Sequence, residues 1–432
     1  MIIKNGIIVD PSQGIEGPGT LVIRDDRIVA VCNRNNVPEK ITENGEEEQV
    51  IDAAGMYVFP GLIDLHVHFR DPGQTEKEDI LTGSAAAAAG GVTTVCAMPN
   101  TKPTVDSVET MKYIKEKAAQ APIRVEQLST ITVGEANEEL VDIPAMKQAG
   151  AIAFSEDGKS VMNTLLYREG LKQIAAVDGL VMSHCEDKDL VDGGVMNAGA
   201  KQQELGHRGI TNAVEDVIVA RDIFMAAEQG VKLHLCHCST RDSVEMMRLA
   251  KKRGYRVTAE TCPHYFTLTD ADIPGDLGNW KMNPPLRSEE DVQALIEGLR
   301  DGTMDAISTD HAPHTAEEKS HGFKSLFGIV GLETSAALTF TALVGPGLIS
   351  ISDMVRLMSW NPAKIIGVDE ERGTFRQGAL ADVVLFDPDK QWVVDPAKFK
   401  SKGRNTPFEG KTLLGKVAMT ICGGKVVYQD AE

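Results

Sequence analysis

Residues 62–72 of the chain are LIDLHVHFRDP, and this stretch decides the fold class. Its apolar residues form a short run typical of a buried strand in a parallel sheet, and the run ends on His66 and His68. Residues i and i+2 of a strand point to the same face, so both imidazoles can bind one metal ion. Metal ligands at the end of a buried strand indicate an α/β enzyme whose site lies at the carboxyl ends of its strands.

The same pattern repeats along the chain as far as residue 310. Short apolar, β-branched runs alternate with longer stretches rich in Ala, Glu and Lys, which predicts strands and helices around a parallel sheet. Eight such strands with helical connections predict a (β/α)8 TIM barrel, a fold of about 250 residues. The expected strands are 62–68, 92–98, 123–131, 151–155, 180–184, 232–237, 255–261 and 304–310, and the expected helices are 78–90, 106–119, 165–176, 213–229, 243–253 and 289–301.

Both ends of the chain have β character. The first residues predict two hairpins, with turns at Asn5-Gly6 and at Asp25-Asp26, and short strands are expected at 381–388, 416–424 and 425–430. Because chain termini often lie close together, the two ends are expected to form one small β-sandwich. The predicted domains are 1–55 and 367–432, which are the two parts of the sandwich, and 56–366, which is the barrel; a polar, acidic loop is expected at 35–49.

Composition and charge exclude several classes of protein. The 432 residues are 42% hydrophobic and 25% charged, which is ordinary for a globular chain. The formal net charge of −19 makes nucleic acid and anionic membranes poor partners, and no apolar run reaches the ~18 to 20 residues of a membrane span. Seven cysteines without a signal peptide predict reduced thiols and a cytoplasmic location.

Further candidate metal ligands follow other predicted strands. Asp157 comes two residues after the fourth strand, and the fifth, sixth and eighth strands end in His184, His237 and Asp310. Strand ends of a barrel meet at one mouth, and mixed imidazole and carboxylate ligands suit Zn²⁺ or another divalent transition metal. His234 lies on the opposite strand face from His237 and is predicted to be structural. The predicted metal ligands are His66, His68, Asp157, His184, His237 and Asp310.

Asp310 lies in STDHAPH (308–314), where a carboxylate can both bind metal and accept a proton. A divalent ion lowers the pKa of the water that it binds to about 7, which supplies hydroxide at neutral pH. Asp310 is therefore the predicted catalytic base, and afterwards the acid that protonates a leaving nitrogen. The predicted reaction is hydrolysis of an amide-like bond.

Arg70 is the candidate anchor for an anionic substrate. It follows His68 by two residues and, if the strand continues, lies on the same face, where its guanidinium can bind a carboxylate. Neutral polar side chains are expected to line the same mouth and to donate or accept hydrogen bonds. They are Asn100 after the second strand, Asn283 after the seventh, and His314 four residues after Asp310.

The motifs DLHVHFRDP (64–72) and STDHAPH, the latter followed by Lys319, resemble those of the bacterial type I dihydroorotases of the amidohydrolase superfamily. The similarity extends through GIVGLE (328–333), SWNPAK (359–364) and NTPFEG (405–410), across essentially the whole chain. It implies a TIM barrel with a small β-sandwich and the reversible hydrolysis of dihydroorotate to N-carbamoyl-aspartate in pyrimidine biosynthesis.

The resemblance also implies roles for individual residues. The six predicted metal ligands match zinc ligands, with Asp310 also the catalytic acid and base. Ser155 stands where hydantoinase-like relatives have a carboxylated lysine, so Asp157 is expected to bridge two zinc ions, with a single zinc ion as the alternative. The substrate-binding positions implied are His68, Arg70, Asn100, Asn283, His314 and the backbone of Phe327 and Gly328.

Two other functions stay open at this point. The first is another cyclic amide hydrolase, such as an allantoinase or a hydantoinase, whose neutral ring offers no acidic group to Arg70. The second is an inactive scaffold for a partner such as aspartate transcarbamoylase, although all six predicted ligands are present. A homodimer is expected from the resemblance, whereas association with aspartate transcarbamoylase has no support in the sequence.

Overall fold

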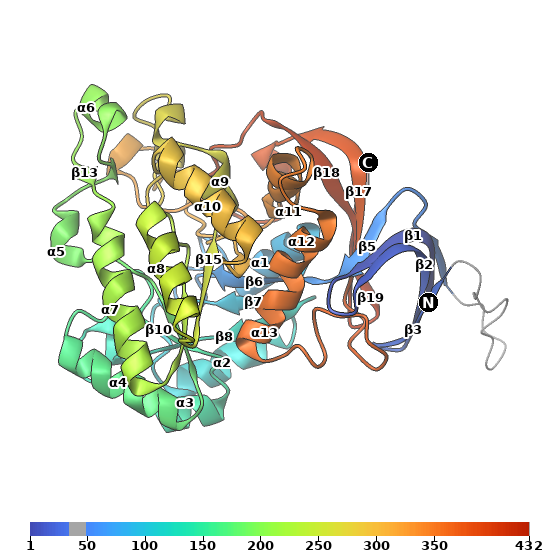
Figure 1. The fold of residues 1–432 in the computed structure, drawn as a ribbon, viewed down its shortest axis with the longest axis horizontal. Coiled ribbons are helices and arrows are strands. Elements are labelled where there is room, and N and C mark those ends of the chain that lie inside the picture. Colours follow the sequence, from blue (N-terminus) through green and yellow to red (C-terminus); the bar gives the residue numbers. More distant parts are fainter. Residues whose placement is uncertain (34–48, 432) are drawn as a thin grey trace.

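The structure is a computed structural model that describes residues 1–33 and 49–431. A body of strands surrounded by helices lies beside a β domain that contains both termini (Figure 1). Except for Gln49, the loop predicted at 35–49 lies outside the described residues. Within the described ranges, no helix combines the length and the apolar composition needed to cross a membrane.

Parallel strands form the barrel in the predicted order. Leu128 divides the third predicted strand into β8, which pairs with β7, and β9, which pairs with β10. A parallel bridge between Val67 and His311 joins the first strand to the segment after the last, which closes the ring. The fold class and the eight predicted strand positions are confirmed. The strands are β6 (Leu62–Val67), β7 (Val92–Ala97), β8 (Arg124–Gln127), β9 (Ser129–Thr130), β10 (Phe154–Ser155), β11 (Leu180–Ser183), β14 (Lys232–Leu235), β15 (Val257–Thr261) and β16 (Ala306–Ile307).

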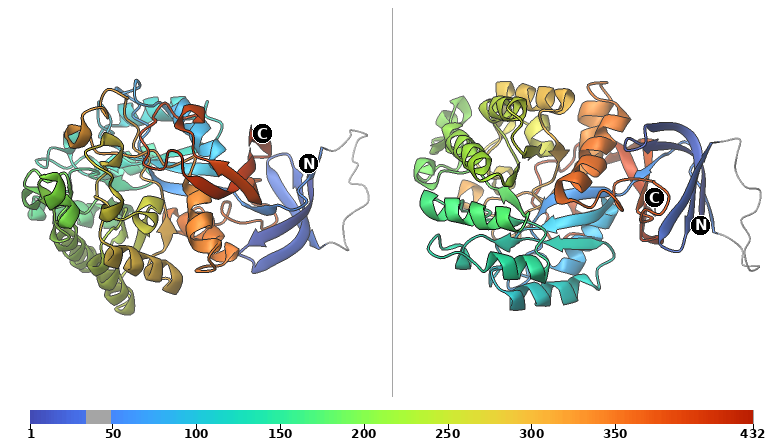
Figure 2. Two further views of the ribbon diagram at one scale, coloured as in Figure 1. Left: turned by 90° about the horizontal axis from the view of Figure 1, so that it is seen from above. Right: turned by 60° about the horizontal axis from the view of Figure 1, so that its bottom comes forward.

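Helices cover the outside of these strands (Figure 2). Side chains cap several of them: Ser107, Asn163 and Thr240 accept hydrogen bonds from the first-turn amides of α2, α4 and α8. In α8, Val244, Met247 and Ala250 recur at helical spacing and are buried. The helices predicted from the sequence are α1 (Ile80–Ala89), α2 (Val108–Ala118), α4 (Thr164–Ala176), α7 (Ala213–Gln229), α8 (Arg241–Lys252) and α10 (Glu289–Asp301).

Other elements extend the barrel. A two-stranded sheet and two short helices form an excursion after β11, which the apolar pattern did not predict. The excursion contains α5 (Lys188–Val191), β12 (Met196–Asn197), α6 (Ala200–Leu205) and β13 (Gly209–Ile210); the remaining helices are α3 (Ile143–Ala149), α9 (Pro263–Thr267), α11 (Ser335–Thr339), α12 (Ile351–Val355) and α13 (Asn361–Ile366).

The β domain is one hydrogen-bonded sheet built from both ends of the chain. β5 pairs with β1 on one side and antiparallel to β17 on the other, which joins the two ends. Buried side chains from both ends, such as Ile8, Leu21, Val383 and Ile421, share a separate hydrophobic core, as expected for a sandwich. The strands are β1 (Ile2–Asp10), β2 (Ile15–Arg24), β3 (Arg27–Asn33), β4 (Val50–Asp52), β5 (Tyr57–Pro60), β17 (Val383–Val393), β18 (Thr412–Cys422) and β19 (Lys425–Gln429).

One of the two predicted hairpins is wrong. Asn5-Gly6 forms no turn but lies inside β1, where the register against β2 shifts between Ile3 and Gly6. Asn5 has φ 67°, so the left-handed residue that suggested a turn makes a bulge in a continuous strand. The second hairpin is confirmed, because β2 and β3 pair antiparallel around Asp25-Asp26. The domain boundaries at 55/56 and 366/367 stay predictions.

Residues 394–411 connect β17 to β18 and are called the strap below. The strap leaves the β domain and contacts barrel segments that lie far away in the sequence. Its residues bond to Glu78 after β6, to Glu333 after β16, and to Ala312 and His314 beside the barrel mouth. The strap therefore links the β domain to the side of the mouth that contains Asp310.

Candidate metal centre and substrate site

The end of β6 brings two imidazoles to two carboxylates. The Nε2 atom of His66 lies 3.3 Å from Asp157 Oδ1 and 3.6 Å from Asp310 Oδ1. The Nε2 atom of His68 lies 3.5 Å from Asp157 Oδ2 and 3.2 Å from Asp310 Oδ1. All four side chains are buried, so these residues form one compact group of potential metal ligands.

A second group lies on the other side of the same carboxylate. Asp157 Oδ1 is 3.7 Å from His184 Nδ1 and 3.9 Å from His237 Nε2, and these two nitrogens are 3.0 Å apart. His184, His237 and Asp157 have the spacing of a metal-binding group, as do His66, His68 and Asp157. The structure thus brings all six predicted ligands together, and Asp157 belongs to both groups.

Several nitrogen and oxygen atoms of these groups that could bind metal have no hydrogen-bond partner within the described residues. They are both ring nitrogens of His66, Nδ1 of His237 and Oδ1 of Asp157. Leaving a buried polar atom unpaired costs about 1–3 kcal/mol, so such atoms at one place in a fold require an explanation. Imidazole nitrogens and carboxylate oxygens are ligands of divalent transition metals, and the donor set fits a metal cofactor.

The electrostatics of the cluster keep its carboxylates ionised. Burial opposes the charge of Asp157, but His66, His237 and His68 hold the pKa of this carboxyl well below its usual value. Burial likewise opposes the charge of Asp310, whereas its hydrogen bond with His68 and the nearby imidazoles lower its pKa. Both carboxylates are therefore charged at neutral pH, as metal binding and proton acceptance require.

Two ligands occupy unusual backbone conformations. Asp310 has φ 49° and His237 has φ 36°, in the left-handed region that residues with a side chain rarely occupy. The turn at Asp310 is held on both sides: Thr309 N–H donates to Asp64 Oδ1, and His68 N–H donates to the carbonyl of His311. Strain that neighbouring hydrogen bonds hold in place is typical of a functional site.

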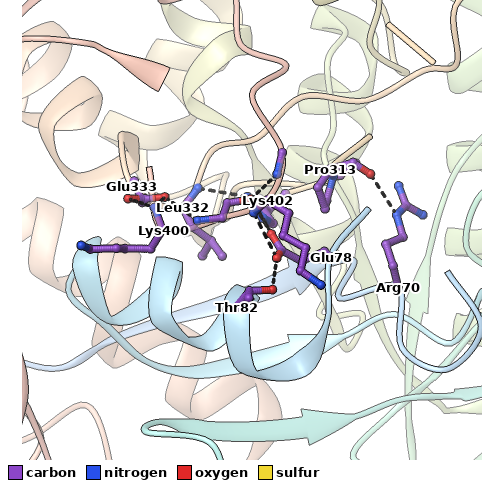
Figure 3. Close-up of polar contacts among 12 residues, drawn as sticks. Arg70, Glu78, Thr82, Pro313, Leu332, Glu333, Lys400 and Lys402 are labelled. Carbon is purple, nitrogen blue, oxygen red and sulfur yellow. Dashed lines mark hydrogen bonds and ion pairs between the residues drawn. The ribbon is translucent and has the colours of Figure 1, made fainter. Parts of the chain in front are cut away.

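Arg70 reaches the mouth by a different route from the one predicted. β6 ends at Val67, and Arg70 has φ 58°, so strand alternation does not set its direction. Its Nε–H donates to the carbonyl of Pro313 at 3.4 Å (Figure 3). Burial lowers the pKa of Arg70, while the charges of Asp310 and Asp157 raise it. Arg70 is thus a cation at the mouth, close to both carboxylates.

Asn100 contacts the first group of ligands directly. Its Oδ1 lies 3.0 Å from Nδ1 of His68, and its Nδ2 donates to Oδ2 of Asp157 at 3.0 Å. Asn283 lies on the side of the second group, where its Nδ2 donates to Glu186 at 3.1 Å. Asn100 therefore contacts the candidate ligands themselves, whereas Asn283 reaches His184 only through Glu186.

His314 lies next to Arg70. Burial, together with Arg70 and Lys77, lowers the pKa of His314 to about 3, so the imidazole is neutral. Its Nε2–H donates to the carbonyl of Phe327 at 2.8 Å. The N–H of Gly328 is already bonded to the carbonyl of Lys281, so part of the backbone that was expected to contact substrate holds the loop together.

Two lysines fix this loop from inside. Nζ of the buried Lys319 donates to the carbonyls of Lys281, Leu326 and Gly328 at 2.9–3.0 Å. Nζ of Lys281 in turn donates to the carbonyls of Phe323 and Ser325, and it lies 4.1 Å from the centre of the Phe327 ring. These bonds hold residues 319–328 against the barrel mouth.

Two carboxylates beside the candidate ligands were not predicted from the sequence. Glu186 accepts from Nε2 of His184 at 3.0 Å, and the charges of His184 and Lys188 outweigh burial and lower its pKa to about 2. Glu260 lies 3.6 Å from Nδ1 of His66 and 3.1 Å from Nε2 of His234. Carboxylates in such positions orient metal-binding histidines. Glu186 follows His184 by two residues, which is a usable signal, whereas Glu260 is inside a strand and has none. His234 has the structural surroundings that were predicted.

Comparison with known families covers most of the chain. Residues 55–243 match a family described as dihydro-orotase-like, and residues 298–428 match an amidohydrolase family. The chain is 46% identical over 432 residues to the dihydroorotase of Syntrophus aciditrophicus. The aligned region covers 100% of this chain and 99% of that protein. It is 47% identical over 431 residues to the dihydroorotase of Pelotomaculum thermopropionicum, with the same coverage of both chains.

Solved structures share the fold across the whole chain. An L-hydantoinase (dihydropyrimidinase) from Arthrobacter aurescens superimposes with a TM-score of 0.86 at 28% identity, covering 100% of this chain and 96% of the other. A D-hydantoinase structure gives the same TM-score at 25% identity, covering 100% and 95%. Sequence identity is thus much higher to proteins named dihydroorotase than to these hydantoinases.

Proposed function

The chain belongs to the dihydroorotase family of amidohydrolases, and from this premise we propose how its site works. The enzyme catalyses the reversible hydrolysis of (S)-dihydroorotate to N-carbamoyl-L-aspartate, a step of pyrimidine biosynthesis. The observation that carries this proposal is the convergence of Arg70, a cation suited to the substrate carboxylate, with four imidazoles and two ionised carboxylates at one barrel mouth. An inactive scaffold would have no need to keep this set of buried, charged groups together.

The proposed cofactor is zinc, with two ions per chain bridged by Asp157. His66, His68 and Asp310 would hold one ion, and His184 and His237 the other. Support comes from the two oxygens of Asp157, since Oδ2 lies toward His68 and Oδ1 lies between His66 and the second pair of histidines. A single zinc ion is the alternative.

Asp310 is the proposed catalytic base and acid. Bound divalent ions supply a Lewis acid for the amide carbonyl and make water more acidic. The ionised Asp310 accepts a proton from the attacking water and then donates it to the leaving ring nitrogen, so no net proton is consumed at the residue. Its bonds to His68 and the left-handed turn keep the carboxylate aimed into the mouth.

Arg70 is the proposed anchor of the substrate carboxylate. A guanidinium binds a carboxylate through two parallel hydrogen bonds, which both attract the substrate and orient its ring. His68, Asn100, Asn283, His314 and the segment Phe327–Gly328 complete the proposed binding site. The neutral rings of hydantoin and allantoin have no carboxylate, so Arg70 favours dihydroorotate over these alternatives.

The first test measures ring opening and metal content on one sample. Purified enzyme is expected to open dihydroorotate, to lose this activity when a chelator removes its metal, and to regain it when zinc is returned. Metal analysis before chelation is expected to give about two ions per chain, in line with bridged two-metal hydrolase sites. Turnover that survives removal of all metal would contradict the proposed chemistry, and a ratio near one would contradict the bridge.

Replacement of Arg70 by methionine tests substrate choice. Arg70→Met is expected to lower kcat/KM for dihydroorotate by about 10²-fold, because it removes a charge-assisted pair worth ~1.5–3 kcal/mol and the orientation that the pair provides. Arg70→Lys keeps the charge but cannot form two parallel hydrogen bonds, so its kcat/KM is expected to lie between those of the wild type and Arg70→Met. Unchanged kinetics of Arg70→Met, or comparable turnover of hydantoin by the wild-type enzyme, would show that the carboxylate is not what Arg70 recognises.

The proposal also places the enzyme in the cytoplasm as a homodimer. The location rests on the reduced cysteines predicted from the sequence, and the homodimer rests on the family resemblance. Association with aspartate transcarbamoylase is not part of the proposal, since no feature of the described residues argues for it.

A further inference from the structure

The motif NTPFEG (405–410) has no role in the chemistry described above, yet its first residue lies beside the substrate site. Asn405 is buried, with 2% of its surface exposed, and belongs to the strap. It faces residues 311–314, the segment that connects Asp310 to the loop containing Lys319. A side chain of the strap is thus in contact with the barrel mouth.

Both ends of the Asn405 amide bond to this segment. Its Nδ2 donates to the carbonyl of Ala312 at 3.0 Å, and its Oδ1 accepts from the N–H of His314 at 3.1 Å. The two bonds flank Pro313, which has no N–H of its own to anchor it. One side chain therefore fixes the backbone on both sides of a single residue.

The fixed residues are those that hold the proposed substrate anchors. The carbonyl of Pro313 accepts from Nε of Arg70 at 3.4 Å, and His314 reaches the carbonyl of Phe327 at 2.8 Å (Figure 3 draws the Arg70–Pro313 bond). The segment also follows Asp310, whose left-handed backbone conformation is unfavourable for a residue with a side chain and needs neighbouring contacts to hold it. A shift of residues 312–314 would displace Arg70 and His314 together.

Other contacts hold the strap without help from the Asn405 side chain. The backbone N–H groups of Lys400 and Ser401 donate to the carboxylate of Glu333 at 2.8–3.1 Å, and Nζ of Lys402 donates to Asp79 at 2.6 Å (Figure 3 shows the side chains of Lys400, Lys402 and Glu333). The carbonyl of Asn405 itself accepts from Val330 N–H at 3.0 Å. Truncation of the side chain therefore removes the bonds to 312 and 314 and leaves the strap attached.

We propose that Asn405 is a positioning residue for substrate binding, which acts through the backbone of residues 312–314 on Arg70 and His314. The inference rests on the function proposed above. It gives the strap a part in substrate affinity that is separate from metal binding. The side chain of Asn405 bonds to Ala312 and His314, which are not among the six proposed metal ligands.

Steady-state kinetics of Asn405→Ala test this proposal. The KM for dihydroorotate is expected to rise about tenfold or more while kcat stays within about threefold, since the anchors are displaced but the metal centre and Asp310 are not. Metal content per chain and metal affinity are expected to equal those of the wild type. Asn361→Ala is the matched control: Asn361 Nδ2 donates to the carbonyl of Asp305 at 2.8 Å, before β16 and away from the mouth, so its KM is expected to stay at the wild-type value.

A second variant reaches the same segment without changing Asn405. A Cβ added at Gly403 would lie 2.7 Å from Cβ of Pro313 and 2.6 Å from Cγ1 of Val330, so Gly403→Ala pushes the strap against Pro313. The same increase in KM is expected. Wild-type KM in folded samples of both variants would overturn the inference, as would an equal loss of kcat and bound metal. Failure of the wild-type enzyme to open dihydroorotate would instead overturn the proposed function, and the inference with it.

Discussion

Asp310→Asn is expected to yield a folded, metal-loaded protein that opens dihydroorotate about 10³-fold more slowly than the wild type, within the range of general acid–base catalysis. The amide keeps an oxygen that can contact metal and His68, but it cannot accept a proton from water or return one to the ring nitrogen. The native carboxylate can do both, and its hydrogen bond with His68 and the charges of His66 and His237 lower its pKa, which keeps it ionised and ready to accept the proton. Turnover in both directions, measured with metal content, checks this result.

The control for Asp310→Asn is the same substitution at the other end of the barrel. Asp178 is exposed before β11 and pairs with Lys232 at 2.8 Å, at the opposite end of this strand from His184. Asp178→Asn is expected to keep wild-type turnover. If Asp310→Asn retains a tenth of the wild-type rate or more, another group transfers the proton, contrary to the mechanism proposed above.

Asp157→Asn is expected to reduce bound metal from about two ions to at most one per chain and to lower turnover by about 10³-fold, as loss of a bridging charge from a two-metal site predicts. An amide has one oxygen and no charge, so it cannot balance four imidazoles or bridge two ions. The close approach of His66, His184 and His237 to Oδ1 gives this single residue its large effect. Metal analysis and chelator competition measure the loss directly.

Ser155→Ala serves as the control on the same strand. Ser155 is two residues before Asp157 and is buried, and its hydroxyl has no hydrogen-bond partner among the described residues. Removing it should leave metal content and turnover unchanged. Two ions bound to Asp157→Asn with wild-type affinity would show that the bridge is elsewhere.

The barrel and the grouping of the six candidate ligands could be predicted because both follow local rules. A buried parallel strand is a short apolar run, and α7 and α10 have the predicted bounds because apolar periodicity marks them and Gly230 and Gly302 end them. His66 lies in such a strand and His68 directly follows it, and Asp310 comes three residues after another strand. Strand ends meet at one mouth in a barrel, so these residues could be placed together without coordinates.

Features that depend on distant parts of the chain could not be predicted in this way. Asn5-Gly6 has the sequence of a hairpin turn, but pairing with β2 on one side and with β4 and β5 on the other keeps β1 continuous. Arg70 bonds to the carbonyl of Pro313, and Asn405 bonds to the backbone on both sides of Pro313. Each of these contacts joins residues that no local pattern relates, which is why Asn405 and Glu260 were missed.

The pairing of β5 with β17 has a consequence for how the enzyme is made. All six candidate metal ligands are translated before residue 311, but Val383 must pair with Pro60 before the sheet that unites the two ends can exist. Contacts between distant residues form late because a long loop must close first. Since the strap follows β17, the proposed support for the substrate anchors is synthesised after all six candidate metal ligands. Full substrate binding is therefore expected only after β17 has paired with β5 and the strap has reached the barrel mouth.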